Sequence, residues 1–132
     1  MSQPSCAYLC AVLVQAETDL ARTIGGNMGV SKMESAPNDY LAFYDTPGLP
    51  PQPGYEYLVS GVQAIMRGGP NKYLETYLAA SAIQEFLHDR TNVTLSGVRL
   101  IAILAQGEPI HGQDDNSRDQ FSMNFLVHRT SA

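Results

Sequence analysis

The segment that most constrains the fold is an alternating run near the end of the sequence, QFSMNFLVHR, at positions 120–129. Alternation with a period of two is typical of a β-strand that has one face in the core and the other in solvent. A chain of 132 residues can bury one such core, so a single domain is expected. We therefore predict a strand whose inward side chains are Phe121, Met123, Phe125 and Val127.

Two segments have the apolar spacing of amphipathic helices. The first covers residues 5–24 and is followed by two glycines that end it. The second lies within residues 68–92, and its apolar face is expected to pack against the C-terminal strand. The residues predicted to make that contact are Leu78, Ala82, Ile83 and Phe86.

Three further segments, 39–46, 55–68 and 98–106, read as strands, and residues 25–39 read as a loop. The near-continuous apolar run of the third indicates burial on both faces, and Gly61 in the second indicates a bulge or a close approach. The order α-β-β-α-β-β predicts an α+β fold, with a mixed or antiparallel sheet of about four to five strands and two helices packed on one face.

A polar loop, EPIHGQDDNSRD, precedes the last strand and contains Asp114, Asp115, Arg118 and Asp119. Its carboxylates could bind a cation, but the glycine and terminal glutamate of an EF-hand loop are missing. A turn with Asx-type backbone bonds and an ion pair of Arg118 is favoured instead. Because the loop is polar yet adjoins an ordered strand, we expect it to contact a neighbouring subunit, with Arg118 bound to a carboxylate.

The composition excludes several classes of partner. The net charge is −5, whereas nucleic-acid binding needs clustered Lys and Arg. No apolar run approaches the roughly 20 residues that span a bilayer, so no membrane partner is expected. Only 16% of residues are charged, against about 25% in typical soluble domains. A low charged fraction favours a protein that covers part of its surface in an assembly.

The sequence contains no recognisable catalytic motif. His88, His111 and His128 are far apart, and the H-E-x-x-H, P-loop and G-x-S-x-G patterns are absent from the sequence. We expect no catalytic residue, no metal site and no cofactor, and we expect Cys6 and Cys10 to be ordinary reduced thiols. A deep pocket that holds one of the histidines beside a carboxylate would instead favour a small enzyme or a ligand-binding domain.

The tail of the chain resembles the minor capsid and tail-terminator proteins of phages with long non-contractile tails. These proteins tend to end in a proline-glycine segment, an acidic D-x-x-x-R loop and a strand that reads like N-F-x-V-x-R. Upstream, LAFYDTPGLP and VQAIMRG resemble the family's first two strands, the second of which usually ends in an arginine, here Arg67. The matching residues of the tail are Pro109, Gly112, Asp114, Asp115, Arg118, Phe121, Ser122, Asn124, Phe125, Val127 and Arg129.

The resemblance implies that residues 1–132 form a single tail-terminator-like α+β domain and a structural, non-catalytic protein of the virion. Such proteins form a ring, usually hexameric, that caps the tail tube, ends its polymerisation and offers a docking surface for the head. The implied partners are further copies of this chain, the tail-tube protein and a head-completion or connector protein, and the implied site of assembly is the host cytoplasm. The genome would pass through the ring without specific binding. A head-completion adaptor or a tail-tube component is the alternative.

The candidate interface residues are Asp114, Asp115, Arg118, Asp119 and Arg67.

Overall fold

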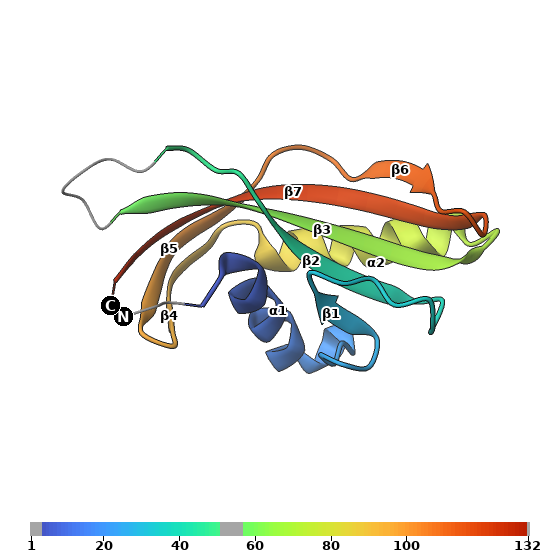
Figure 1. Ribbon diagram of the computed structural model, residues 1–132, viewed down its shortest axis with the longest axis horizontal. Coiled ribbons are helices and arrows are strands. Elements are labelled where there is room, and N and C mark those ends of the chain that lie inside the picture. Colours follow the sequence, from blue (N-terminus) through green and yellow to red (C-terminus); the bar gives the residue numbers. More distant parts are fainter. Residues whose placement is uncertain (1–3, 51–56, 132) are drawn as a thin grey trace.

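The computed structural model describes residues 4–50 and 57–131. In this part of the chain, two α-helices and a short 3-10 helix accompany one seven-stranded sheet (Figure 1). The elements are α1 (Cys6–Ala16), η1 (Thr18–Leu20), β1 (Met28–Val30), β2 (Tyr40–Thr46), β3 (Leu58–Pro70), α2 (Tyr73–Leu87), β4 (Arg90–Leu95), β5 (Val98–Ala105), β6 (Ile110–Gln113) and β7 (Arg118–Ser131).

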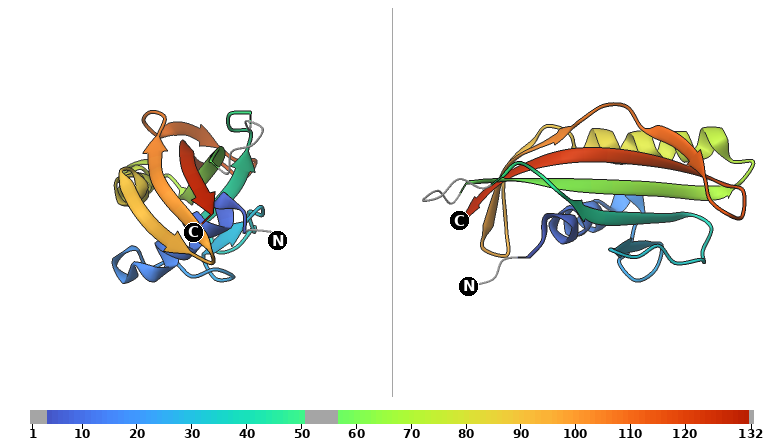
Figure 2. Two further views of the ribbon diagram at one scale, coloured as in Figure 1. Left: turned by 90° about the vertical axis from the view of Figure 1, so that its left-hand side faces the viewer. Right: turned by 45° about the horizontal axis from the view of Figure 1, so that its top comes forward.

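The strands are arranged in the order β1-β2-β3-β7-β5-β4, and β6 pairs separately with β7. One edge of β7 pairs with β3, while its other edge is shared by β6 near its start and β5 near its end. Every pair is antiparallel except β1 with β2, so the sheet is mixed. The sheet is curled (Figure 2). The predicted α+β class is confirmed, with seven strands where four to five were expected.

The inner face of the sheet is set by the register of β3 with β7. Val62 pairs with Phe125 and Met66 pairs with Phe121, so their side chains lie on the same face. The odd-numbered apolar residues of β7 are all buried and belong to one hydrophobic cluster with residues of both helices. These residues are Phe121, Met123, Phe125 and Val127.

Helix α1 is shorter than predicted because a local bond ends it. The backbone turns to an extended conformation at Glu17, whose side chain accepts a hydrogen bond from Asp19 N. Glu17 is the N-cap of η1, in which the chain continues. At the start of the helix, Ala7 N donates a hydrogen bond of 3.1 Å to Asp45 Oδ1. Asp45 lies on the inner face of β2, so this bond anchors α1 to the sheet.

Helix α2 is rotated relative to the prediction. Thr76 packs so closely on the sheet that a Cβ at Gly68 would lie 2.0 Å from Thr76 Oγ1. Because Thr76 faces inward, Leu78 and Ala82 face outward: both are exposed, Leu78 by 57%. Their predicted contact with β7 is wrong. Of the other predicted contacts, Ile83 is buried and Phe86 is partly buried against the core.

The strands that the sequence did not predict are short or polar. β1 lies in the glycine-rich segment predicted to be a loop, and β6 lies in the polar loop before β7. β4 forms a hairpin with β5 through Ser96 and Gly97, which both have positive φ. β5 was expected to be buried on both faces, but Val98, Leu100 and Ile103 are buried while intervening residues are exposed or half-buried.

Gly61 shows the close approach predicted for it. A Cβ at this position would lie 2.3 Å from Thr46 Oγ1, in the β2 strand that pairs with it. The two cysteines are free thiols buried on α1, and burial raises the pKa of both. Among the described residues, no helix is both long enough and apolar enough to cross a membrane.

Truncation of Phe125 to alanine should lower the free energy of unfolding by about 3–5 kcal/mol, because it opens a cavity between β7 and the helices. Chemical denaturation of Phe125→Ala measures this change. Leu78→Ala is the matched control and should shift stability by less than about 0.5 kcal/mol, since Leu78 is exposed. Equal effects of the two substitutions would contradict the orientation of α2.

Candidate functional site

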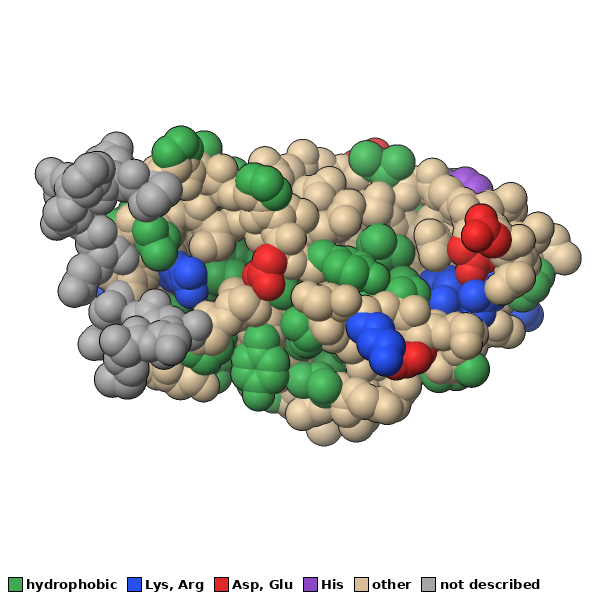
Figure 3. Space-filling model, viewed as in Figure 1, with side chains coloured by type: hydrophobic (Ala, Val, Ile, Leu, Met, Phe, Trp, Pro, Cys, Tyr) green, Lys and Arg blue, Asp and Glu red, His purple; other side chains and the backbone are tan. Residues whose placement is uncertain are grey.

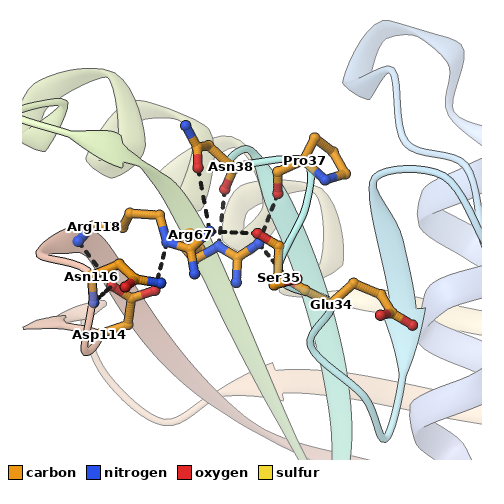
Figure 4. Close-up of polar contacts among 8 residues, drawn as sticks. All are labelled: Glu34, Ser35, Pro37, Asn38, Arg67, Asp114, Asn116 and Arg118. Atoms are coloured by element: carbon orange, nitrogen blue, oxygen red, sulfur yellow. Dashed lines mark hydrogen bonds and ion pairs between the residues drawn. The ribbon is translucent and has the colours of Figure 1, made fainter.

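A group of charged side chains gathers at the end of the sheet where β3 finishes and β7 begins. Arg67 pairs with Gln120 and Arg118 pairs with Pro70, so both arginines lie on the outer face, opposite the core. The segment of residues 31–39, which joins β1 to β2, crosses this face beside them (Figure 4). Acidic and basic side chains adjoin one another at this end of the molecule (Figure 3).

Arg67 is the side chain around which the 31–39 segment is organised. Its Nε donates to the carbonyl of Asn38 at 3.0 Å, and its Nη2 donates to the carbonyls of Glu34 at 2.6 Å and Pro37 at 2.7 Å. Only 2% of Arg67 is exposed. Burial, and then the nearby Arg118, lower the pKa of Arg67. The three carbonyls compensate for this desolvation and hold the segment against the sheet.

Arg118 ties the loop before β7 to the same segment. Its Nε donates to Asp114 Oδ2 at 2.7 Å, and its Nη1 donates to the carbonyl of Ser35 at 2.7 Å. Asp114 Oδ1 also accepts from the backbone N–H groups of Asn116 at 3.0 Å and Arg118 at 2.9 Å. The predicted Asx-type turn with an Arg118 ion pair is confirmed.

These bonds favour the ionised form of Asp114. Burial alone would raise the pKa of its carboxyl, but the hydrogen bonds from Arg118 and Asn116 outweigh burial and lower it. A carboxylate held in this way accepts hydrogen bonds throughout the neutral range and is unsuited to exchanging a proton with a substrate.

Asp119 lies on the other face of the sheet, where its carboxylate binds the start of helix α2. Its Oδ2 accepts from Lys72 N at 3.1 Å, at a helix start where the N-cap side chain makes no capping bond. Its Oδ1 lies 2.9 Å from His111 Nε2 on β6. The hydrogen bond with His111 is the main cause that lowers the pKa of Asp119. One carboxylate thus links β6, β7 and the first turn of α2.

The structure brings all five candidate interface residues to one end of the molecule and engages four of them in hydrogen bonds within the chain. Arg67, Arg118 and Asp119 are buried and Asp114 is half-buried. Arg118 was expected to reach a carboxylate of a neighbouring subunit, whereas in this chain it binds Asp114, four residues earlier. Asp115, at the tip of the turn, is exposed.

Arg67, Arg118 and Asp114 form a structural clamp, which holds residues 31–39 and the turn before β7 in place. Its partners in the 31–39 segment are mainly backbone carbonyls, which no side-chain pattern in the sequence marks, so sequence reasoning missed them. The one recognisable signal was the D-x-x-x-R spacing of Asp114 and Arg118, which suits an ion pair across a tight turn. In the described part of the chain, no group of three or more His, Cys, Asp or Glu side chains is placed to hold a metal ion.

Replacement of Arg67 by methionine, which keeps the stem but removes the donors, should lower the free energy of unfolding by about 2–4 kcal/mol, because three carbonyls lose a partner. Denaturant unfolding measures the loss, and faster hydrogen exchange in residues 34–38 should accompany it. Arg99→Met is the control, because Arg99 is exposed on β5. A fully stable Arg67→Met variant would show that the clamp contributes nothing.

The lowered pKa values of Asp114 and Asp119 also make stability depend on pH. Each carboxyl has a folded pKa below its ordinary value of 3.8, so unfolding takes up protons in acid. The stabilisation is present above that value and is lost as the pH falls through the folded pKa. We expect the melting temperature to drop below about pH 4, and Asp119→Asn to flatten this decline. A decline of unchanged steepness in Asp119→Asn would contradict the assignment.

Comparison with known proteins reveals the fold rather than a family. No protein-family model matches the sequence, and no curated protein sequence is significantly similar to it. A chain in the solved structure titled "Virion of native gene transfer agent (GTA) particle" superimposes with a TM-score of 0.69 at 13% identity, covering 92% of each chain. A second solved chain, 16% identical, gives a TM-score of 0.44, too low to bear on function. The protein therefore shares its fold with a component of a gene transfer agent particle.

Proposed function

We propose that this protein is a structural component of a phage-like virion. The observation that carries the proposal is the shared fold with a chain of a gene transfer agent particle, over 92% of both chains. The match covers nearly the whole length of both chains, so it concerns the overall architecture rather than one motif. The resemblance of the C-terminal segment to phage tail-terminator proteins points the same way and rests on different information.

Within the virion, the role we propose is that of a tail terminator. Copies of the chain would form a ring, with six subunits as the model, that caps the tail tube and presents a docking surface for the head. The contacts would be with further copies, with the tail-tube protein and with a head-completion or connector protein. We propose a purely structural role, because the ionisable groups of the clamp are occupied by hydrogen bonds within the chain.

A ring needs apolar surface that a neighbour can cover, and helix α2 offers it. Leu74 and Leu78 lie one turn apart and are 60% and 57% exposed, and Ala82 continues the row. Burial of such a row would favour association by roughly 25 cal/mol per Å² of apolar surface removed from water. The same repeating contact closes into a ring when the rotation between copies permits it.

The distribution of charge suits a ring through which DNA passes. Arg22, Arg67 and Arg118 are buried and bound to groups of this chain, so they cannot meet phosphate. The net charge of −5 per chain is repeated in every copy of a ring. Charge of the same sign as the genome disfavours adhesion to it.

An aspartate in place of Leu78 should prevent ring formation and leave the fold intact, because it would place an unpaired charge in the contact between copies. Circular dichroism checks the fold, and negative-stain electron microscopy with mass photometry checks assembly, with and without tail tubes. Gln106→Asp adds the same charge in an exposed loop and should assemble normally.

Three results would contradict the proposal in different ways. Normal rings from Leu78→Asp would rule out α2 as the contact. A particle map that places the chain along the tube or at the head connector would rule out the terminator role and retain the virion assignment. A map of complete particles without this chain would remove the virion assignment itself.

A further inference from the structure

The outer face of the sheet is uncharged over its central strands. Both helices pack on the inner face, where they share one hydrophobic cluster with β3 and β7 (Figure 2). On the outer face, the outward residues of β3 from Gly61 to Ile65 and of β7 from Ser122 to Leu126 are all uncharged, and so is Tyr44 of β2, which pairs with Gln63. We call this surface the outer band, and it consists of Tyr44, Gln63, Ile65, Ser122, Asn124 and Leu126.

An uncharged surface of this kind is unusual on a sheet face that meets water. Antiparallel sheets with one face on the core normally place polar and charged side chains on the other face. The centres of protein interfaces, by contrast, are depleted of charged residues. The members of the outer band are half-buried, so each keeps some surface for a partner. The composition of the outer band is therefore that of a surface covered by another protein.

The charge of the chain indicates which partner can cover the outer band. Each copy carries a net charge of −5, so copies repel one another wherever acidic surfaces meet. Helix α2 offers a second uncharged surface, the exposed row of Leu74, Leu78 and Ala82, which ends before Glu85. The outer band and this row can meet without burying a charge that has no partner. A second copy of the chain thus supplies a surface that fits.

The two surfaces lie on opposite sides of the molecule. Helix α2 packs on the inner face through Thr76 and Ile83 and turns its apolar row away from the sheet, whereas the outer band lies on the opposite face. A contact between the two is therefore heterologous, because each copy offers its helix to one neighbour and its sheet to another. An isologous contact through either surface would leave the other surface bare.

We propose that the outer band binds the apolar row of α2 from the next copy of the chain. The proposal rests on the ring put forward above and names the second half of its contact. A helix on this face would give the sheet a helical layer on each side, an arrangement that sheets commonly adopt. The dimensions agree, because the row from Leu74 to Ala82 spans about 12 Å along the helix, and Ser122 to Leu126 spans about 13 Å along β7.

Cross-linking between variants with one added cysteine tests the pairing of the two surfaces. Leu78→Cys places a thiol on the row and Ser122→Cys places one in the outer band, while the native cysteines are buried. With a short bis-maleimide, we expect a mixture of the two variants to give a cross-linked dimer and each variant alone to give none. Thr94→Cys, exposed on the edge strand β4, replaces Ser122→Cys in the control mixture and should give no product. A dimer formed by Leu78→Cys alone, or no dimer in the mixture, would overturn the proposal.

Complementation between two assembly-deficient variants tests the direction of the contact. Gln63→Glu adds a charge to the outer band with little change of shape and should weaken self-association about tenfold or more, because that charge would be buried without a partner. Leu78→Asp breaks the other half of the contact. In a mixture, the intact α2 of the Gln63→Glu chain can still bind the intact outer band of the Leu78→Asp chain. Sedimentation velocity should therefore show a dimer in the mixture and no larger ring.

The matched control is Gln15→Glu on α1. It adds the same charge outside both surfaces and keeps the side-chain oxygen that accepts from Ile24 N, so it should assemble like the parent chain. Circular dichroism checks that both glutamate variants are folded. Association of Gln63→Glu equal to that of Gln15→Glu would overturn the outer band as the contact and leave α2 in place.

Two further outcomes separate this contact from the proposed function. A Ser122→Cys chain that cross-links to the tail-tube protein and not to α2 would show that the outer band has a different occupant, and would overturn the proposal. A folded parent chain that stays monomeric, in solution and on tail tubes, would overturn both this contact and the ring. The virion assignment would still rest on the shared fold.

Discussion

The antiparallel pairing of β3 with β7 is the contact on which the other elements depend. The register runs from Leu58 with Arg129 to Arg67 with Gln120, and it decides which side chains face inward. A shift of β7 by one residue against β3 would turn the apolar row of β7 to solvent. The same register places Asp119 under α2 and Arg118 on the outer face, although the two are adjacent in sequence. One strand pairing thus positions the core, the helix start and the clamp.

Both helices are anchored by carboxylates that come from strands rather than from the helices themselves. Asp45 on β2 accepts a bond from the first turn of α1, and Asp119 on β7 accepts one at the start of α2. An acidic group at a helix N-terminus is stabilised by the helix dipole, so each bond fixes both the start of the helix and its position on the sheet. This arrangement explains why polar residues occur on the otherwise apolar inner face.

The sequence predicted those features that repeat regularly along the chain. The alternation of residues 121–127 identified the buried row of β7, and the polar, aspartate-rich composition of the loop before it identified the turn of Asp114 and Arg118. The rotation of α2 was not predictable, because it depends on Thr76 meeting Gly68, 8 residues earlier, across a tight contact. The roles of Arg67 and Asp119 depend on carbonyls and an N–H group that any residue could supply. The Ser96-Gly97 hairpin was a signal present in the sequence, and it would have revealed β4.

The arginines of this chain illustrate how composition and accessible charge differ. Eight basic residues against 13 acidic ones already give a net negative chain. Three of the arginines, Arg22, Arg67 and Arg118, are buried. Arg67 and Arg118 donate their hydrogen bonds to the 31–39 segment and hold it in place. Buried guanidinium groups are stable only where acceptors surround them, a condition that Arg67 meets and Arg22 meets in part. The surface that remains is poor in cations. Charge therefore offers little attraction between copies, whereas the apolar row of α2 would supply a contact that salt does not weaken.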